Sequence, residues 1–125
     1  MSSTNPVIYF EIPVNDLNRA EAFYTAVFGF VFEREIIDNY EMALFPFTDA
    51  KAGISGALAK GDVYVPSKNG VILYFKTFDI DDTIQKAITK GGSLLYPKTH
   101  NDTHGFFVAE IEDSEGNRIA LHQQF

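Results

Sequence analysis

Cysteine is absent from this chain of 125 residues. Without a thiol there is no disulfide, no cysteine nucleophile and no cysteine-ligated metal. Basic residues are also scarce, because ten Lys and Arg stand against 17 Asp and Glu, for a formal net charge of -7. This balance argues against nucleic acid or an anionic membrane as the main partner, since both attract basic surfaces.

Long apolar runs are missing as well. No run approaches the ~18 residues that a membrane-spanning helix needs. The N-terminal residues Met-Ser-Ser-Thr-Asn-Pro are polar and lack the basic and apolar segments of a signal peptide. We therefore expect a cytoplasmic protein that does not enter a membrane.

Two common catalytic patterns are also missing. The glycines at 53 and 56 and at 91 and 92 lack the strand–glycine–helix context of a phosphate-binding loop. Ser55 lacks the elbow pattern of serine hydrolases. Phosphate-loop chemistry and nucleophilic catalysis by serine are therefore not expected.

What the chain does contain is one strand–helix unit that occurs twice. Asp16 follows an apolar stretch and is a good N-cap for an amphipathic helix that ends at Gly29. Asp79 and Gly91 bound a second such helix. The two aspartates are 63 positions apart and the two glycines 62, so the spacing indicates an internal duplication.

Each half is predicted to be a strand, a helix and then three strands. The predicted elements are residues 7–14, 17–28, 30–38, 40–47 and 54–60 in module one (about 7–60), and 71–78, 80–90, 93–96, 105–112 and 118–123 in module two (about 71–123). The stretch 61–70 joins the halves. Pro97 is expected to end its strand, and a polar loop with His100 and His104 follows. The prediction is one α+β domain over residues 1–125.

Two motifs resemble the vicinal-oxygen-chelate superfamily, which includes glyoxalase I, extradiol dioxygenases, and fosfomycin- and bleomycin-resistance proteins. The early motif is Asn15-Asp16-Leu17-x-x-Ala20-x-x-Phe23-Tyr24-x-x-x-Phe28-Gly29-Phe30, and the late one is Glu112-Asp113-Ser114-Glu115-Gly116-Asn117-Arg118-Ile119. The resemblance covers about residues 7–123. It implies two βαβββ modules that form a curved mixed sheet around a cleft, with the helices on the convex side.

The resemblance also implies four metal-ligand positions on cleft-facing strands, usually His or Glu. They correspond to Tyr9, to Gly56 or a neighbour, to Ile72 or Leu73, and to Ala120. Glycine, isoleucine and alanine side chains offer no donor atom to a divalent ion. We therefore expect no metal and no other cofactor, unless the ligands are placed differently or come from the loop histidines.

Glu11 and His122 are the best acid–base pair that the chain offers. Glu11 alternates with the core residues of its strand, so it is expected on the cleft face. The alternative for Glu11 is an ion pair with Lys60, Lys76 or Arg118. The alternative for His122 is a structural hydrogen bond.

Tyrosines are predicted to line the cleft, because each combines an apolar ring with a polar tip. The alternative is that these rings fill a closed core or a dimer interface. The predicted ligand-binding residues are Tyr9, Tyr40, Met42, Leu58, Lys60, Tyr74 and Tyr96, and Tyr64 in the joining stretch is a candidate to fold over the pocket.

Three functions remain open from the sequence. The first is metal-free binding of a small aromatic or cationic molecule in the tyrosine-lined cleft. The second is an enzyme related to lactoylglutathione lyase or to the dioxygenases, with a non-standard metal site. The third is acid–base catalysis by Glu11 and His122. A homodimer is expected in each case, because of the resemblance and because exposed strand edges need cover.

Overall fold

The computed structural model describes residues 6–48 and 53–125. Module one comprises β1 (Tyr9–Val14), α1 (Leu17–Phe28), β2 (Glu33–Ile37), β3 (Tyr40–Leu44) and β4 (Ser55–Lys60). Module two comprises β5 (Tyr74–Lys76), α2 (Ile80–Thr89), β6 (Ser93–Asn101), β7 (Phe106–Glu112) and β8 (Arg118–Gln124). The predicted α+β fold with two βαβββ modules is confirmed.

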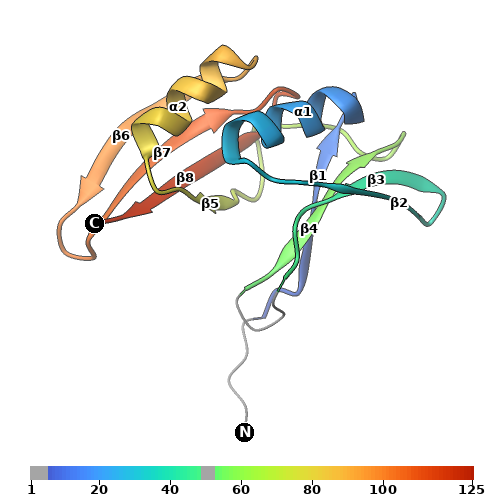
Figure 1. Ribbon diagram of the computed structural model, residues 1–125, viewed down its shortest axis with the longest axis horizontal. Helices are drawn as coiled ribbons and strands as arrows, with labels where there is room; N and C mark the ends of the chain where they lie inside the picture. Colours follow the sequence, from blue (N-terminus) through green and yellow to red (C-terminus); the bar gives the residue numbers. More distant parts are fainter. Residues whose placement is uncertain (1–5, 49–52) are drawn as a thin grey trace, which may run out of the picture.

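Each module folds into its own mixed sheet, so the strands form two sheets rather than one continuous one. The strand orders are β1-β4-β3-β2 and β5-β8-β7-β6. In each sheet the first strand of the module lies at an edge and pairs in parallel with the last strand. Figure 1 shows the two sheets apart from each other, with α1 and α2 in contact on the same side of the molecule.

Both predicted N-caps and the glycine end of α1 are confirmed, whereas α2 ends at Thr89 with Lys90 as its C-cap, just before Gly91. The Asp16 carboxylate accepts a hydrogen bond from the backbone N–H of Arg19 at 3.0 Å, and that of Asp79 accepts one from Asp82 at 3.1 Å. Gly29 has φ 80°, the left-handed conformation that terminates α1. These short-range signals position each helix directly after the first strand of its module.

The strand that contains Pro97 is longer than predicted. Pro97 was expected to end it, but β6 continues from Ser93 to Asn101, and His100 lies in the strand rather than in a loop. β6 is an edge strand, and its pairing with β7 shifts register between Tyr96 and Thr99. An edge strand with a bulge tolerates proline, because the missing N–H is not needed for the ladder.

One apolar core is shared by the two modules. Its buried members include Phe23, Tyr24 and Leu58 from module one and Ile111, Ile119 and Leu121 from module two. Aromatic rings join the sheets directly, because the Phe75 ring of β5 lies 5.9 Å from the Phe45 ring and 6.5 Å from the Phe10 ring. The modules are therefore packed as one unit.

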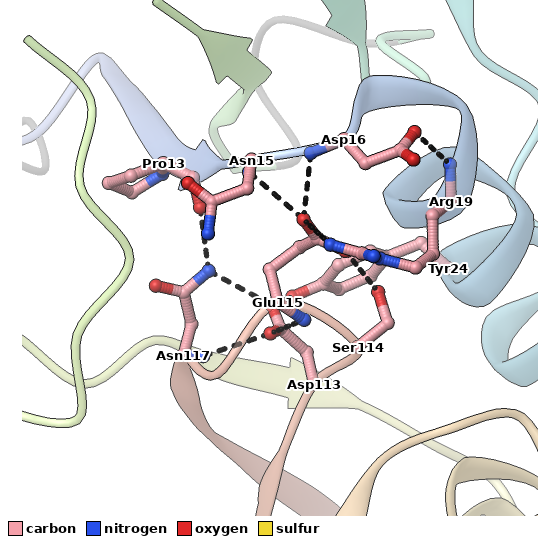
Figure 2. A network of polar contacts seen from close by, with 9 residues as sticks. All are labelled: Pro13, Asn15, Asp16, Arg19, Tyr24, Asp113, Ser114, Glu115 and Asn117. Carbon is pink, nitrogen blue, oxygen red and sulfur yellow. Dashed lines mark hydrogen bonds and ion pairs between the residues drawn. The ribbon is translucent and has the colours of Figure 1, made fainter. Parts of the chain in front are cut away.

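Glu115 fastens the β7–β8 turn to the start of α1. Its side chain is completely buried and accepts hydrogen bonds from the backbone N–H groups of Asn15 and Asp16, both at 2.9 Å. Its other oxygen lies 2.6 Å from Nε of Arg19. Figure 2 shows the carboxylate pointing from the turn toward the residues between β1 and α1. The two motifs that carry the family resemblance are therefore in direct contact.

Asp113 makes a second set of bonds beside Glu115. It accepts the Tyr24 hydroxyl at 2.7 Å and the backbone N–H groups of Glu115 and Asn117 at 2.9 Å each. Asn117 in turn donates to the carbonyl of Pro13 at 2.7 Å. Burial raises the pKa of Asp113 and raises that of Tyr24 well above its usual range. We call this network the polar clasp; its members are Asn15, Asp16, Arg19, Tyr24, Asp113, Glu115 and Asn117 (Figure 2).

Neither helix among the described residues is long and apolar enough to cross a membrane.

Candidate functional site

The sheet of module one carries tyrosines and carboxylates on the surface that faces away from α1. Ile12 and Leu58 are packed in the core, so Tyr9 and Glu11, which alternate with Ile12, lie on the opposite surface. Register then places further side chains there, because Ala57 pairs with Glu11, and Met42 pairs with both Ala59 and Glu35. We call this surface face A; it comprises Tyr9, Glu11, Glu33, Glu35, Tyr40, Met42, Ala57 and Ala59.

Glu11 is held between two tyrosine hydroxyls. Tyr9 donates to Oε2 at 2.9 Å, and Tyr64, from the segment that joins the modules, donates to Oε1 at 2.8 Å. The Tyr9 hydroxyl also lies 3.7 Å from the sulfur of Met42, which is buried beneath these rings. Tyr64 therefore lies against Glu11 on face A.

A third tyrosine extends this group. The Tyr40 ring meets the Tyr64 ring edge to face at 5.4 Å, and its hydroxyl donates to Asp62 at 2.9 Å. An added Cβ at Gly61 would overlap the Tyr40 ring, so the absence of a side chain there permits this close approach. The Glu11 frame, defined as Glu11 with Tyr9, Tyr40 and Tyr64, is thus supported from β1, β3 and the joining segment.

The two tyrosines that contact Glu11 are neutral phenols at physiological pH. Burial and the hydrogen bond to Glu11 raise the pKa of Tyr9 to about 12. For Tyr64, the hydrogen bond to Glu11 is the main cause, and its pKa also rises to about 12. Both hydroxyls therefore keep their protons and donate hydrogen bonds to the carboxylate.

Face A is acidic. Glu33 and Glu35 pair with Leu44 and Met42, which puts their side chains on the same surface as Glu11. The two basic residues of these four strands lie on the other side. Arg34 bonds to α1, and Lys60 pairs with the buried Val14.

The sheet of module two has a mixed surface on the side away from its helix, with a basic part. Tyr74 pairs with Ala120, and Lys76 pairs with His122. Arg118 forms an ion pair with Glu110, and its guanidinium lies 5.2 Å from the centre of the Tyr96 ring. We call this surface face B; it comprises Tyr74, Lys76, Tyr96, Glu110, Arg118, Ala120 and His122.

Two predicted ligand-binding residues lie elsewhere. Leu58 is fully buried in the core beside Ile12, and Lys60 belongs to the α1 side of the sheet. Gly56, one of the implied metal positions, also faces the core, because an added Cβ would overlap the carbonyl oxygen and ring of Phe10. The prediction put Leu58 and Lys60 of this strand on the cleft face, but the residues on that face are their neighbours Ala57 and Ala59. A shift of one residue along a strand moves every side chain to the opposite face of the sheet.

The residues at the implied metal positions do not form a donor set. Tyr9 and Ala120 lie on the surfaces away from the helices, and so do Ser55 and Ala57, the neighbours of the core-facing Gly56. The third position, Ile72 or Leu73, precedes β5, and neither side chain has a donor atom. Alanine has no donor, and Tyr9 uses its hydroxyl on Glu11. No group of three His, Asp or Glu residues that could hold an ion occurs within residues 6–48 and 53–125.

The proposed acid and base belong to different sheets. Glu11 lies in the first sheet with both oxygens bonded to tyrosines, whereas the His122 ring stacks on Phe106 at 4.9 Å in the second. No hydrogen bond or ion pair between Glu11 and His122, Lys60, Lys76 or Arg118 is present in the part of the chain that the structure describes. In β6 and the turn after it, His100 bonds to Asp102, and the His104 ring stacks on Phe106.

Sequence reasoning missed Glu33 and Glu35. The sequence contained a signal for them, the pair Asp38-Asn39, which favours a tight turn. In the structure these residues have φ 52° and 69°, and their turn sets the β2–β3 register. Counting back from that turn places Glu35 opposite Met42 and puts Glu33 on the same surface of the sheet. The acidity of face A follows from that register.

A family model described as Glyoxalase/Bleomycin resistance protein/Dioxygenase superfamily matches residues 7–121. No curated protein matches the sequence significantly.

Solved structures show the same fold at low sequence identity. A V278E mutant of glyoxalase I from Zea mays matches with TM-score 0.74 and 19% identity over 94% of this chain, which spans 46% of that chain. A glyoxalase/bleomycin resistance protein/dioxygenase family enzyme from Burkholderia phytofirmans matches with TM-score 0.74 and 19% identity, over 94% of this chain and 97% of that one. The fosfomycin resistance protein FosX from Listeria monocytogenes matches with TM-score 0.69 and 17% identity, over 100% and 96%.

Proposed function

The chain belongs to the Glyoxalase/Bleomycin resistance protein/Dioxygenase superfamily, and we propose that within it this protein binds a small cationic molecule at the Glu11 frame, without a metal. The observation that carries the proposal is a carboxylate held by two neutral tyrosines at 2.9 and 2.8 Å. Hydrogen bonds from hydroxyls orient the carboxylate and leave its negative charge in place.

The chemistry of the frame favours an ammonium group over an anion. Tyrosine rings attract a cation through their π faces, and a carboxylate beside them adds a direct charge. Glu33 and Glu35 increase the negative potential of the same surface. An anionic ligand would meet repulsion from all three carboxylates.

Choline and its neutral isostere 3,3-dimethyl-1-butanol test this assignment. We expect the native protein to bind choline at least about five-fold more tightly than the alcohol, because only choline gains the cation–π and carboxylate interactions. Glu11→Gln should reduce this preference, because only the cation–π interaction with the tyrosine rings remains. Binding can be followed by tyrosine fluorescence, since the chain has six tyrosines and no tryptophan.

Glu35→Gln is the matched control for Glu11→Gln. It removes the same charge from face A but does not touch a tyrosine hydroxyl, so we expect less than about a two-fold effect on choline affinity. If both variants bind choline as the native protein does, or if choline and the alcohol bind equally, the cation site is refuted.

We propose the absence of a metal because of the side chains at the four family positions. Two of these positions carry alanine or serine and a third carries Tyr9, whose hydroxyl is bonded to Glu11. Elemental analysis of protein purified without chelator should find well below one divalent ion per chain. Stoichiometric nickel, zinc, iron or manganese that survives dialysis would contradict this proposal and favour the metalloenzyme alternative.

We also propose a homodimer, supported by the exposed apolar residues that flank the edge strands β1 and β5. The edge strands β1 and β5 and the residues before them expose Ile8 and Val71, each 86% exposed, and Phe78 after β5 is 90% exposed. Such apolar edges favour association.

Sedimentation equilibrium should give about twice the 14.0 kDa mass of one chain. Val71→Glu should weaken the dimer at least about ten-fold, because it places a charge on the apolar edge. Val31→Glu, the same substitution at a position 79% exposed between α1 and β2, serves as the control. A native protein that stays monomeric up to its solubility limit contradicts the proposal.

A further inference from the structure

A pocket of about 350 Å³ opens at the seam between the two modules. Its walls are Phe10, Phe30 and Phe45 of module one and Leu73 and Phe75 of module two. Phe10 alternates with Glu11 along β1 and packs on the core side, so this pocket is distinct from the Glu11 frame on face A. We call it the seam pocket.

The seam pocket has the composition of a ligand site rather than of a packing defect. A volume of about 350 Å³ lies within the range of small-molecule sites and far above the space that one water molecule needs. Phe10, Phe30, Phe45 and Phe75 form an aromatic cluster, and all of them except Phe45 are only partly buried. Covering these rings with an apolar ligand would remove their remaining surface from water.

A single basic side chain stands at the rim. Lys76 leaves β5 on face B but borders the pocket, because β5 is the edge strand of its sheet. It makes no ion pair within residues 6–48 and 53–125. The other polar lining side chains, Ser55 and Tyr74, carry hydroxyl groups, and Ser55 already donates its hydroxyl to the carbonyl of Pro46 at 2.8 Å. The charge that is free for a ligand is therefore positive.

The backbone of β5 adds hydrogen-bonding groups to the same wall. The Leu73 carbonyl accepts from Ala120, and the Thr77 N–H donates to His122, so these residues bond to β8. Alternation along a parallel pair turns the backbone groups of Tyr74 and Lys76 toward the free edge. Both residues line the seam pocket, so their N–H donors and C=O acceptors lie beside the apolar walls.

From these features we infer that the seam pocket binds a small aromatic carboxylate. The ring of such a ligand fills the space between the phenylalanines, where offset and edge-to-face contacts are favourable. Its carboxylate reaches Lys76 and the free backbone N–H groups of β5. A bicyclic ring of about ten carbons fits a pocket of this size, and a larger polar ligand would lose its hydrogen bonds to water against the phenylalanines.

A tryptophan introduced at the rim provides the test. Ile54 lines the pocket and is 40% exposed, so Ile54→Trp puts the only tryptophan of the chain beside it. Ile36→Trp, at a position 73% exposed on β2, is the matched reporter remote from the seam. The probe is 2-naphthoate, its neutral counterpart is 2-naphthamide, and equilibrium dialysis with the native chain gives the affinities independently of either reporter.

We expect 2-naphthoate to change the tryptophan emission of the Ile54→Trp variant saturably, to leave that of Ile36→Trp unchanged, and to bind more tightly than 2-naphthamide. Lys76→Gln should weaken 2-naphthoate about five-fold and leave 2-naphthamide unchanged, whereas Lys90→Gln on the far end of α2 should alter neither. Choline should not compete, because it binds the other side of β1.

Three results would overturn the inference. One is equal affinity for the acid and the amide in both the native chain and Lys76→Gln. Another is a saturable response of the Ile36→Trp variant in the absence of one from Ile54→Trp. The third is a tryptophan emission of Ile54→Trp that changes with protein concentration in the absence of ligand, while naphthoate binding is lost. That result would assign the pocket to an interface between copies.

Discussion

Glu115→Ala should lower the free energy of unfolding by about 2 kcal/mol or more, as expected when two part-buried backbone N–H groups lose their acceptor. The Glu115 carboxylate is completely buried and accepts two backbone N–H groups as well as the Arg19 guanidinium. Its loss leaves the N–H groups of Asn15 and Asp16 without acceptors. Since domains of this size have a total stability of roughly 5–15 kcal/mol, urea unfolding will show the change clearly.

Glu21→Ala is the control for this experiment. Glu21 pairs with Arg34 at 2.7 Å, but the side chains of Arg34 and Glu21 are 39% and 32% exposed. Exposed pairs contribute less than about 1 kcal/mol, so this variant should remain close to the native protein. A Glu115→Ala variant that is as stable as Glu21→Ala would show that the polar clasp does not hold the modules together.

Glu115→Gln separates charge from packing through pH. Burial alone would raise the pKa of Glu115, but the bonds from Arg19 and from the backbone N–H groups outweigh it, and the pKa lies below its ordinary value. A lowered folded-state pKa contributes stability above the ordinary value, about pH 4.3, and that stability is lost as pH falls. The Gln variant should therefore lose less stability than the native protein on acidification. Asp113, whose pKa burial raises, contributes the opposite slope in both proteins.

Sequence reasoning succeeded where a structural signal is local. Asp16 and Asp79 were expected as N-caps and Gly29 as a helix end, and the structure confirms all three. Each feature depends on hydrogen bonds or dihedral angles within about four residues, so neighbouring residues suffice to predict it. Because the strand–helix unit occurs twice in the sequence, these local predictions were sufficient to predict both modules.

Sequence reasoning failed where the answer depends on register or on a neighbouring strand. Leu58 was expected on the ligand side. The strand around it has small residues on both faces, with Ser55, Ala57 and Ala59 on one and Gly56 on the other, so no alternation identifies the buried face. Pro97 was expected to end a strand, and only the edge position of β6 explains why it does not. Pairing between strands far apart in sequence decided both outcomes.

The candidate site was predicted in part for the same reason. Tyr9, Glu11, Tyr40 and Met42 lie on one surface as expected, because their strands alternate clearly. Tyr74, Tyr96 and His122 lie on the other sheet. The alternation of residues along a strand shows which face a side chain lies on. It carries no information on how two sheets, or two copies of the chain, are placed relative to each other.

Phe45→Ala should destabilise the protein by about 3–5 kcal/mol, the usual cost of removing a large buried side chain. Phe45 is 6% exposed, and its ring centre lies 4.8 Å from that of Phe32 and 5.3 Å from that of Phe10. The rings of Tyr24 and Phe75 lie 5.5 and 5.9 Å away. The variant therefore leaves a cavity at the centre of the aromatic cluster, which calorimetry will detect as a lower melting temperature.

Phe78→Ala is the control, since Phe78 is 90% exposed and its truncation removes little packing. The shape of the transition carries further information, because Phe45 and Phe75 belong to different modules and meet in one core. If that shared core couples the modules, native protein and Phe45→Ala each unfold in a single transition. Two separate transitions in Phe45→Ala would mean that each module has enough core of its own. The aromatic cluster would then only join modules that fold independently, and the stability lost in Glu115→Ala would be confined to their interface.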